Sequence, residues 1–327
     1  MAESDPFDLP DIYDPKFRIT RDTALLTAGS CFAQHIGAAL GDAGFNVIDT
    51  EPAPDGTPDA AQRRFGYGLY SARYGNIYTL RQLRQLVEEA AGVFTPAMPV
   101  WEREGRYFDA QRPGVEPDGL GAPGLVSEMR RRHLEAVASA FASADVVVYT
   151  LGLTEAWEHR VSGTVYPIAP GTIAGAYDPQ TFALRNFGIE ETLTDFARVH
   201  SYLSELNPDI HWLLTVSPVP LTATATDQHV LVASTQSKAI LRTAAGMIAA
   251  EYDCVDYFPS YELVTNPAAA GRAFTDNLRN PTPEMIRAVM QCFMQAHGVE
   301  VATEPARTQG QDPDDICEEA LLEAFRT

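Results

Sequence analysis

Short apolar runs alternate along the chain with segments whose apolar residues recur at helical spacing. The runs are of strand length, and they cover residues 24–28, 45–48, 145–151, 212–216 and 255–258. The third run is apolar almost throughout rather than alternating, which is typical of a strand buried on both faces. Helical patterns lie between the runs: Phe32, Ile36 and Leu40 recur every four residues, and longer patterns cover 232–251 and 283–296.

This alternation predicts a parallel sheet that is covered by helices on both faces. We expect a three-layer α/β/α sandwich whose five-stranded parallel sheet has a flavodoxin-like, doubly wound arrangement. In that arrangement, ligands bind outside the carboxyl ends of the strands. The candidates for a site are therefore the residues that directly follow the strands, at 29–31, 152–155, 217–220 and 259–262.

The predicted domain covers residues 21–297, after an N-terminal arm, 1–20, and before an acidic C-terminal tail, 298–327. Two segments rich in Gly, Pro and aromatic residues, at about 94–124 and 161–188, interrupt the alternation, and we expect loop insertions there. Long loops of this kind are often lids or walls of a binding site, and a plain surface insertion is the alternative. The tail carries a short amphipathic pattern that would suit a contact between copies of the chain, as in a homo-oligomer.

Charge narrows the classes of ligand. The 327 residues include 24 basic and 44 acidic ones, which gives a net charge of −20 at neutral pH. Such a field repels phosphate backbones and anionic lipid surfaces, so we expect neither nucleic acid nor membrane as a main partner. The first ten residues contain no apolar stretch of signal-peptide length, and the longest apolar run, 146–153, is too short to span a bilayer. We therefore expect a soluble, cytoplasmic protein.

Metal ions and organic cofactors are not expected either. The four cysteines lie far apart with no CxxC pair, which is not the pattern of a disulfide framework or a zinc site. The seven histidines have no spacing that would place two of them on one helix face as metal ligands. The glycines at 66, 68 and 75 complete neither a dinucleotide-binding fingerprint nor a P-loop.

The sequence Gly29-Ser30-Cys31 marks a place where chemistry can occur, because a predicted strand ends there and a predicted helix begins. Amides and the dipole at a helix start can stabilise a negative charge that develops on an oxygen atom. A Ser30 that only caps the helix is the alternative. Cys31 has two interpretations as well: a small buried apolar residue, or a nucleophile whose thiolate the helix favours.

At these positions the chain resembles a known family. Residues 29–33, Gly-Ser-Cys-Phe-Ala, match the motif that gives the GSCFA domain family its name, and this family is a branch of the SGNH/GDSL hydrolase superfamily. Further blocks of the sequence resemble the family in the same order, at 75–78, 150–157, 215–220, 237–238 and 257–262. The resemblance therefore covers about residues 25–293, and it implies an SGNH hydrolase-like fold.

The superfamily resemblance implies a serine nucleophile, here Ser30, that accepts acyl groups from esters, often those of acetylated sugars. It also implies an oxyanion hole, with the Ser30 amide, Gly75 or its neighbour Asn76, and the Gly152–Glu155 turn as counterparts. Glu155 stands where the pattern has Asn, and an ionised carboxylate cannot donate a hydrogen bond. Either Asn76 is the donor, or Glu155 orients a base or a substrate hydroxyl, or it is a salt-bridge partner.

The general base is missing from its expected position. The superfamily takes it from a DxxH motif after the last strand, and the matching stretch here, Asp276 to Arg279, contains no histidine. Arginine stays protonated and cannot act as a base. His229, with Asp227 or Glu155 to hold its tautomer, is the candidate substitute. The alternative is that His229 is a partly buried loop residue or the start of a helix.

The sequence contains two further cations of interest. Arg112, in the first insertion, would bind an anionic group of the substrate or have a structural role. Lys238, on a helix face opposite Ile240 and Leu241, is expected to be solvated.

The leading hypothesis is a serine ester hydrolase or acyltransferase that acts on a carbohydrate-linked or small-metabolite ester without a cofactor. One alternative is a non-catalytic binding or assembly protein on a hydrolase scaffold. The other is an acyltransferase that depends on Cys31.

Overall fold

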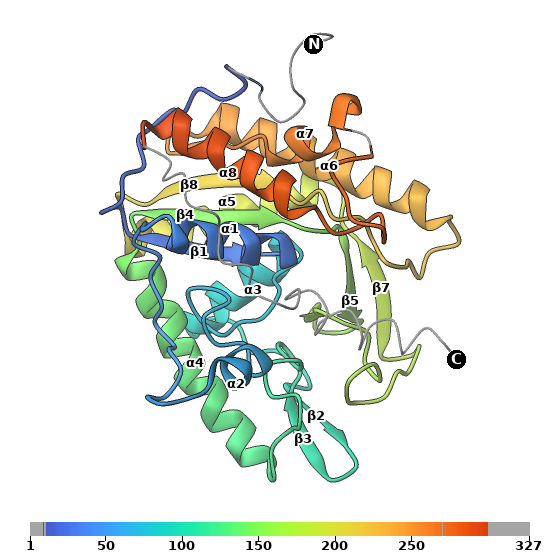
Figure 1. Cartoon of the computed structure of the whole chain (residues 1–327). Coiled ribbons are helices and arrows are strands. Elements are labelled where there is room, and N and C mark those ends of the chain that lie inside the picture. The colour runs from blue at the N-terminus through green and yellow to red at the C-terminus, as the bar shows by residue number, and fades with distance from the viewer. Residues whose placement is uncertain (1–8, 10, 270, 300–327) are drawn as a thin grey trace.

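A parallel sheet of four strands forms the centre of the structure (Figure 1). The computed structural model describes residues 9, 11–269 and 271–299. The strands lie in the order β1-β4-β8-β9, and all neighbouring pairs are parallel. Their bounds are Leu25–Gly29 for β1, Val146–Leu151 for β4, His211–Val216 for β8 and Val255–Tyr257 for β9. The predicted parallel α/β architecture is therefore confirmed.

The expected five-stranded sheet is not confirmed, because residues 45–48 form only one bridge, between Val47 and Leu25. Beyond that bridge another segment occupies the edge of β1: Thr27 donates its amide to Oγ of Ser71, and Ser71 donates its amide to the Thr27 carbonyl. Val47 nevertheless lies outside β1, while β4 lies on its other side. The chain therefore adds strands on one side of β1 first and on the other side afterwards. This reversal of strand order lies between β1 and β4, and doubly wound folds bind their ligands at such a point.

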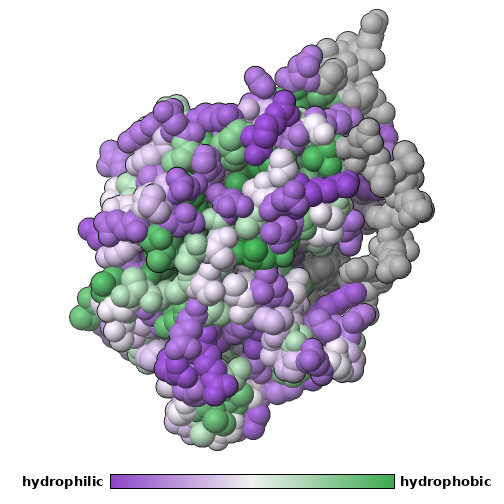
Figure 2. Space-filling model, turned by 90° about the vertical axis from the view of Figure 1, so that its left-hand side faces the viewer, coloured by the Kyte–Doolittle hydropathy of each residue, from purple (hydrophilic) through white to green (hydrophobic). Residues whose placement is uncertain are grey.

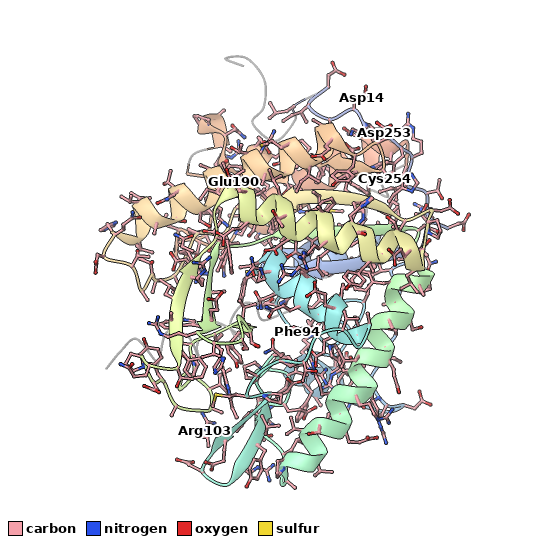
Figure 3. The ribbon with its side chains drawn as sticks, turned by 180° about the vertical axis from the view of Figure 1, so that it is seen from behind. Asp14, Phe94, Arg103, Glu190, Asp253 and Cys254 are labelled. Atoms are coloured by element: carbon pink, nitrogen blue, oxygen red, sulfur yellow. The ribbon has the colours of Figure 1, made fainter. Side chains whose placement is uncertain are left out.

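Helices cover both faces of the sheet, as the sequence predicts (Figures 1 and 3). One face carries α1 (Cys31–Asp42), α7 (Ser260–Thr265) and α8 (Pro283–His297). The other carries α3 (Leu80–Ala90), α4 (Pro123–Ser143), α5 (Ile189–Leu206) and α6 (Val230–Glu251). Along β4, Val146 and Val148 pack toward the first face, and Val147 and Tyr149 toward the second. This two-sided burial explains why the strand is apolar throughout.

The two predicted loop insertions contain strands of their own. The first holds the antiparallel pair β2 (Val100–Arg103) and β3 (Arg106–Asp109), after the short helix α2 (Asp59–Arg64) earlier in the chain. The second belongs to an antiparallel sheet in the order β6-β5-β7. Its strands are β5 (Glu155–His159), β6 (Val165–Tyr166) and β7 (Phe182–Asn186). The insertions pack on each other through a shared core that includes Trp101, Phe108, Tyr166 and Phe182.

A short 3-10 helix, Pro267–Ala269, completes the elements. The predicted C-terminal tail lies outside the described residues from position 300 on, and so does the contact between copies that it would make. On the face shown in Figure 2, hydrophilic residues surround smaller apolar patches.

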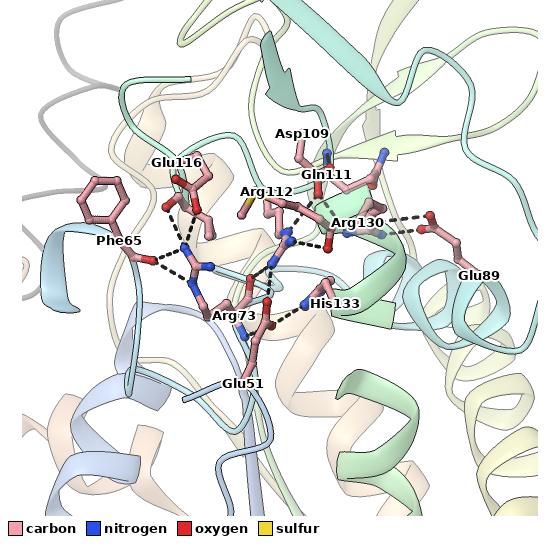
Figure 4. Close-up of polar contacts among 12 residues, drawn as sticks. Glu51, Phe65, Arg73, Glu89, Asp109, Gln111, Arg112, Glu116, Arg130 and His133 are labelled. Carbon is pink, nitrogen blue, oxygen red and sulfur yellow. Dashed lines mark hydrogen bonds and ion pairs between the residues drawn. The ribbon is translucent and has the colours of Figure 1, made fainter. Parts of the chain in front are cut away.

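Arg112 lies in a buried network of charges rather than at a binding site (Figure 4). Its guanidinium donates to Asp109 at 2.9 Å and to the Arg73 carbonyl at 2.8 Å, and it pairs with Glu51 at 3.3 Å. His133 lies 2.7 Å from the same Glu51 carboxylate. The substrate-binding role expected for Arg112 is therefore wrong, because its donors are used within the protein and it does not line the pocket described below.

This network predicts a specific acid sensitivity. Burial opposes ionisation of Glu51, but the hydrogen bond from His133 and the charge of Arg112 hold its pKa at about 2. A carboxyl group with a lowered pKa stabilises the fold above its unfolded pKa, near 4.5, and this stabilisation is lost as the pH falls toward 2. We expect Glu51→Gln to lower the free energy of unfolding by about 3 kcal/mol at pH 7 and by much less near pH 2.

Denaturant unfolding at a series of pH values measures this difference. Glu135→Gln is the matched control, because among the described residues Glu135 makes only an exposed ion pair with Arg131, and such pairs contribute little to stability. A loss of stability in Glu51→Gln that does not change with pH would contradict the role of its ionisation.

Candidate functional site

Ser30 stands where β1 ends and α1 begins, directly beside the end of β4. Gly29 makes this possible: its φ is +133°, and a Cβ at this position would lie 2.4 Å from the carbonyl oxygen of Thr150. Only glycine adopts this backbone without strain and fits the close approach. On the other side, a Cβ at Gly152 would lie 2.8 Å from the Cβ of Ser30. The turn after β4 therefore packs directly against the Ser30 side chain.

The hydroxyl of Ser30 has no structural task in the described part of the chain. Ser30 is the N-cap residue of α1, but its side chain accepts no capping hydrogen bond. The residue is 2% exposed, and Oγ has no hydrogen-bond partner among the described residues. A buried hydroxyl without a partner costs about 1–3 kcal/mol, so a purely structural cap does not account for it.

Ser30 and Cys31 line a pocket at the carboxyl ends of β1, β4 and β8. The wall is mostly apolar, and its lining residues are 30–31, 78, 152–153, 155–157, 167–169, 172, 184, 217, 219–223, 225 and 279. The second insertion and the loop after β8 supply most of them, so the second insertion forms a wall of the site. Among these described lining residues, the charged residue types are represented by Glu155 and Arg279.

The oxyanion donors that the resemblance implies are occupied elsewhere. The Ser30 amide donates to the Thr150 carbonyl at 3.1 Å, and the Gly152 amide donates to the Tyr78 carbonyl at 3.2 Å. Nδ2 of Asn76 donates to the Tyr78 hydroxyl at 2.9 Å. The predicted oxyanion hole is therefore not assembled in this arrangement.

Gly75 and Asn76 also lie outside the set of residues that line the pocket. Gly75 is near Val115 and Arg112 instead, in the direction of the buried charge network. Asn76 accepts from Gln34 at 3.1 Å and from the Tyr70 hydroxyl, whose oxygen also lies 3.1 Å from the Ser30 carbonyl oxygen. Asn76 thus supports the backbone below Ser30 and does not face the pocket.

Glu155 is a pocket residue, as expected. Both of its carboxylate oxygens accept from the Thr224 hydroxyl, at 2.8 and 3.0 Å, and within the described residues it forms no ion pair. The salt-bridge alternative is therefore wrong. Partial burial raises the pKa of Glu155, and the hydrogen bond from Thr224 opposes this rise.

His229 and Asp227 are not brought to Ser30. Both are exposed, and neither lines the pocket. His229 is the N-cap of α6, where its Nδ1 accepts from the amide of Leu231 at 3.2 Å. The structure therefore matches the alternative in which His229 starts a helix, because the loop after β8 leaves the pocket beyond Ala225.

Arg279 occupies the block in which the superfamily has its histidine, and it lines the pocket. A tight loop places it there: Leu278 has a φ of +57°, and Oδ1 of Asn277 accepts from the amides of Arg279 and Asn280. Sequence reasoning excluded Arg279 as a base but did not identify it as a pocket residue.

Lys238 was expected to be solvated, and that expectation is wrong. The residue is 3% exposed, and its Nζ donates to the Gly152 carbonyl at 2.8 Å. A signal was present in the sequence, because Ser234, Lys238, Leu241 and Ala245 follow each other at helical spacing and all are buried.

A comparison with protein families decides the family. The model of the GSCFA family matches residues 24–293, which is most of the chain. The chain belongs to the GSCFA family. The match includes Ser30, Lys238 and Arg279, so the candidate site lies within the GSCFA region.

Comparisons with individual proteins add little to the description of this GSCFA chain. No curated protein matches it. Among solved structures, a candidate platelet activating factor from Streptococcus pneumonia is 12% identical with a TM-score of 0.29, and the match covers 47% of this chain and only 60% of that one. A candidate GDSL-like lipase from Parabacteroides merdae is 15% identical with a TM-score of 0.36, over 88% of this chain and 100% of that one. Both TM-scores lie below 0.5, so neither likeness carries an argument.

The described residues of this GSCFA protein contain no helix with the length and apolar character needed to cross a membrane. Nor do residues 9, 11–269 and 271–299 contain a group of three or more His, Cys, Asp or Glu side chains placed to hold a metal ion.

The contact between Thr224 and Glu155 generates a prediction about the site. Thr224→Val keeps the shape of the side chain and removes the hydrogen bonds that favour the ionised carboxylate. We therefore expect the pKa of Glu155 to rise further in this variant. A ¹³C NMR titration of the glutamate side-chain carboxyl groups measures it, with Glu155→Gln to assign the signal. An unchanged or lowered pKa would contradict the assigned role of Thr224.

Proposed function

We propose that this GSCFA protein is a serine ester hydrolase or acyltransferase in which Ser30 attacks the carbonyl carbon of an ester. The observation that carries the proposal is the Ser30 hydroxyl: it is buried without a partner among the described residues, at the wall of a pocket and at the start of a helix. An arrangement of this kind suits a nucleophile, which must meet its substrate without competing hydrogen bonds.

In the proposed reaction, the Ser30 oxygen adds to the ester carbonyl, and the tetrahedral intermediate expels the alcohol. Water, or a second alcohol, then takes the acyl group from Ser30. Two features near Ser30 favour the negative charge of the intermediate: the N-terminal end of α1, and the permanently charged guanidinium of Arg279 in the pocket. These features would replace the occupied donors described above.

The lining supports a small-metabolite or carbohydrate-linked ester as substrate. Trp157 and Tyr78 line the pocket together with aliphatic residues, and aromatic rings of this kind can pack on the apolar face of a sugar. Glu155, on the same wall, can accept a hydrogen bond from a substrate hydroxyl when it is ionised.

Cys31 is the second candidate nucleophile, because it also lines the pocket and is the first residue of α1. A binding protein without catalysis is the remaining alternative. His229 and Asp227 would have to leave the start of α6 to serve as the base and its partner, so they are tested as variants.

Labelling with a fluorophosphonate tests the proposal, because this probe forms an adduct with an activated serine. We expect peptide mass spectrometry of the full chain to locate one adduct at Ser30, and Ser30→Ala to reduce labelling at least 100-fold, as expected when a nucleophile is removed. His229→Ala, Asp227→Ala and Cys31→Ala should keep the adduct.

The other outcomes separate the alternatives. Loss of labelling in a folded His229→Ala variant would favour His229 as the general base, as the sequence predicts. An absence of serine adducts with rapid alkylation of Cys31 by iodoacetamide would favour the cysteine. If neither residue reacts in folded protein, the chain is better described as a binding protein.

A further inference from the structure

Lys238 is an exceptional cation in this chain. Of the 24 basic residues, 22 are arginines and two are lysines, Lys16 and Lys238. Lys16 is exposed, whereas Lys238 is buried in α6. Buried lysines are rare unless they are paired, because a low dielectric disfavours the ammonium form. Within the described residues Lys238 has no ion-pair partner, and its hydrogen bond is to the carbonyl oxygen of Gly152.

That hydrogen bond brings the amine next to the candidate nucleophile. Gly152 accepts from Nζ of Lys238 and at the same time packs against the Cβ of Ser30. A second contact fixes the same turn to α6, because the Ser237 hydroxyl accepts from the amide of Thr154 at 3.1 Å. Gly152 therefore contacts both Lys238 and Ser30, while Nζ makes no hydrogen bond to Oγ of Ser30 in this arrangement. Catalytic hydrogen bonds often form only in the complex with substrate.

The surroundings of Lys238 lower its pKa and so shift the amine toward the neutral form. Burial, together with a smaller effect of the Arg279 charge, lowers the pKa of Lys238 to about 7, although Cys31 on α1 acts in the opposite direction. No carboxylate of the described chain contributes. A substantial fraction of Lys238 is therefore a neutral amine at neutral pH, which an arginine in its place could not be.

Lys238 is not one of the lining residues, but its amine is bonded to Gly152, which is one, and a base is missing from the lining itself. None of the described residues that line the pocket is a histidine, Arg279 cannot accept a proton, and Glu155 is hydrogen-bonded to Thr224. A neutral lysine side chain has two N–H donors and one lone pair. It can donate to the Gly152 carbonyl and still accept a proton from a neighbouring hydroxyl.

We propose that the neutral amine of Lys238 is the general base for Ser30, an inference that rests on the proposed function above. As the Ser30 oxygen bonds to the ester carbon, its O–H bond breaks and the proton passes to Nζ. The ammonium returns this proton to the alcohol oxygen as the ester C–O bond breaks. In the second half, the proton of the attacking water or alcohol passes to Nζ and then to Oγ of Ser30, which restores both groups.

The pH dependence of labelling tests this role without any variant. We expect the rate at which the fluorophosphonate labels Ser30 to rise with pH through about 7 and then level off, because the neutral amine is the active form. The chain has two lysines, so NMR with ¹³Cε-labelled lysine gives two signals, and Lys16→Met assigns them. The titration of the Lys238 signal should coincide with the rate profile.

Variants then distinguish a base from a structural cation. Lys238→Met keeps the length of the side chain without a lone pair, and Lys238→Arg keeps the charge. We expect both to slow labelling of Ser30 about 100-fold or more and to remove the rise near pH 7. In Lys238→Ala, added methylamine should restore part of the rate in proportion to its concentration. Lys16→Met is the matched control and should label like the wild type.

The failures are separable. No adduct at Ser30 in wild-type protein would overturn the proposed function. An adduct whose rate profile does not follow the Lys238 titration would overturn only the role of Lys238. A folded Lys238→Arg variant that is labelled at the wild-type rate would also overturn only the role of Lys238. If the Lys238 variants do not fold, the comparison of the labelling-rate profile with the Lys238 titration in wild-type protein still tests the proposal.

Discussion

The close approach between the ends of β1 and β4 is the constraint on which the site depends. A Cβ at Gly29 would lie 2.4 Å from the Thr150 carbonyl oxygen, and one at Gly152 would lie 2.8 Å from the Cβ of Ser30. No larger residue fits at either position unless backbone or the serine side chain moves. The two glycines thus let the turns after both strands meet, so that Ser30 and Gly152 line the pocket together and Lys238 bonds to the Gly152 carbonyl.

The protein buries its cations in two different ways. Arg112 is surrounded by acceptors, namely Asp109, Glu51 and the Arg73 carbonyl, and this pairing is what allows a permanent charge to lie inside the protein. Among the residues that the structure describes, Lys238 has only the carbonyl oxygen of Gly152 as a hydrogen-bond partner. An amine tolerates such a position because it can lose its proton, and burial itself produces the neutral form that a base requires. The two sites therefore have different tasks: the first joins an insertion to the domain, and the second supplies the base of the proposed reaction.

Local sequence patterns predicted most of the fold because they record burial directly. The apolar run at β4 requires helices on both faces, and Gly29-Ser30 marks the end of a strand and the start of a helix. The prediction of a fifth strand was not confirmed, for a reason that a local sequence pattern does not contain. Residues 45–48 have the composition of a strand, but Ser71, from a later segment, pairs with Thr27 and takes the edge of β1. The strands inside the insertions likewise depend on contacts between distant segments, because their core contains residues of both insertions.

The candidate site shows why residue type alone misleads. Histidine is the usual base near neutral pH, yet the position of His229 at the start of α6 leaves it exposed. Lysines are usually solvated, yet Lys238 lies at helical spacing from Ser234 and Leu241, on the buried face of the same helix. Periodicity is the stronger signal here, because it fixes the environment, and the environment decides whether a side chain can be a base. A buried amine next to a nucleophile suits the reaction better than an exposed imidazole whose Nδ1 is already occupied as a helix cap.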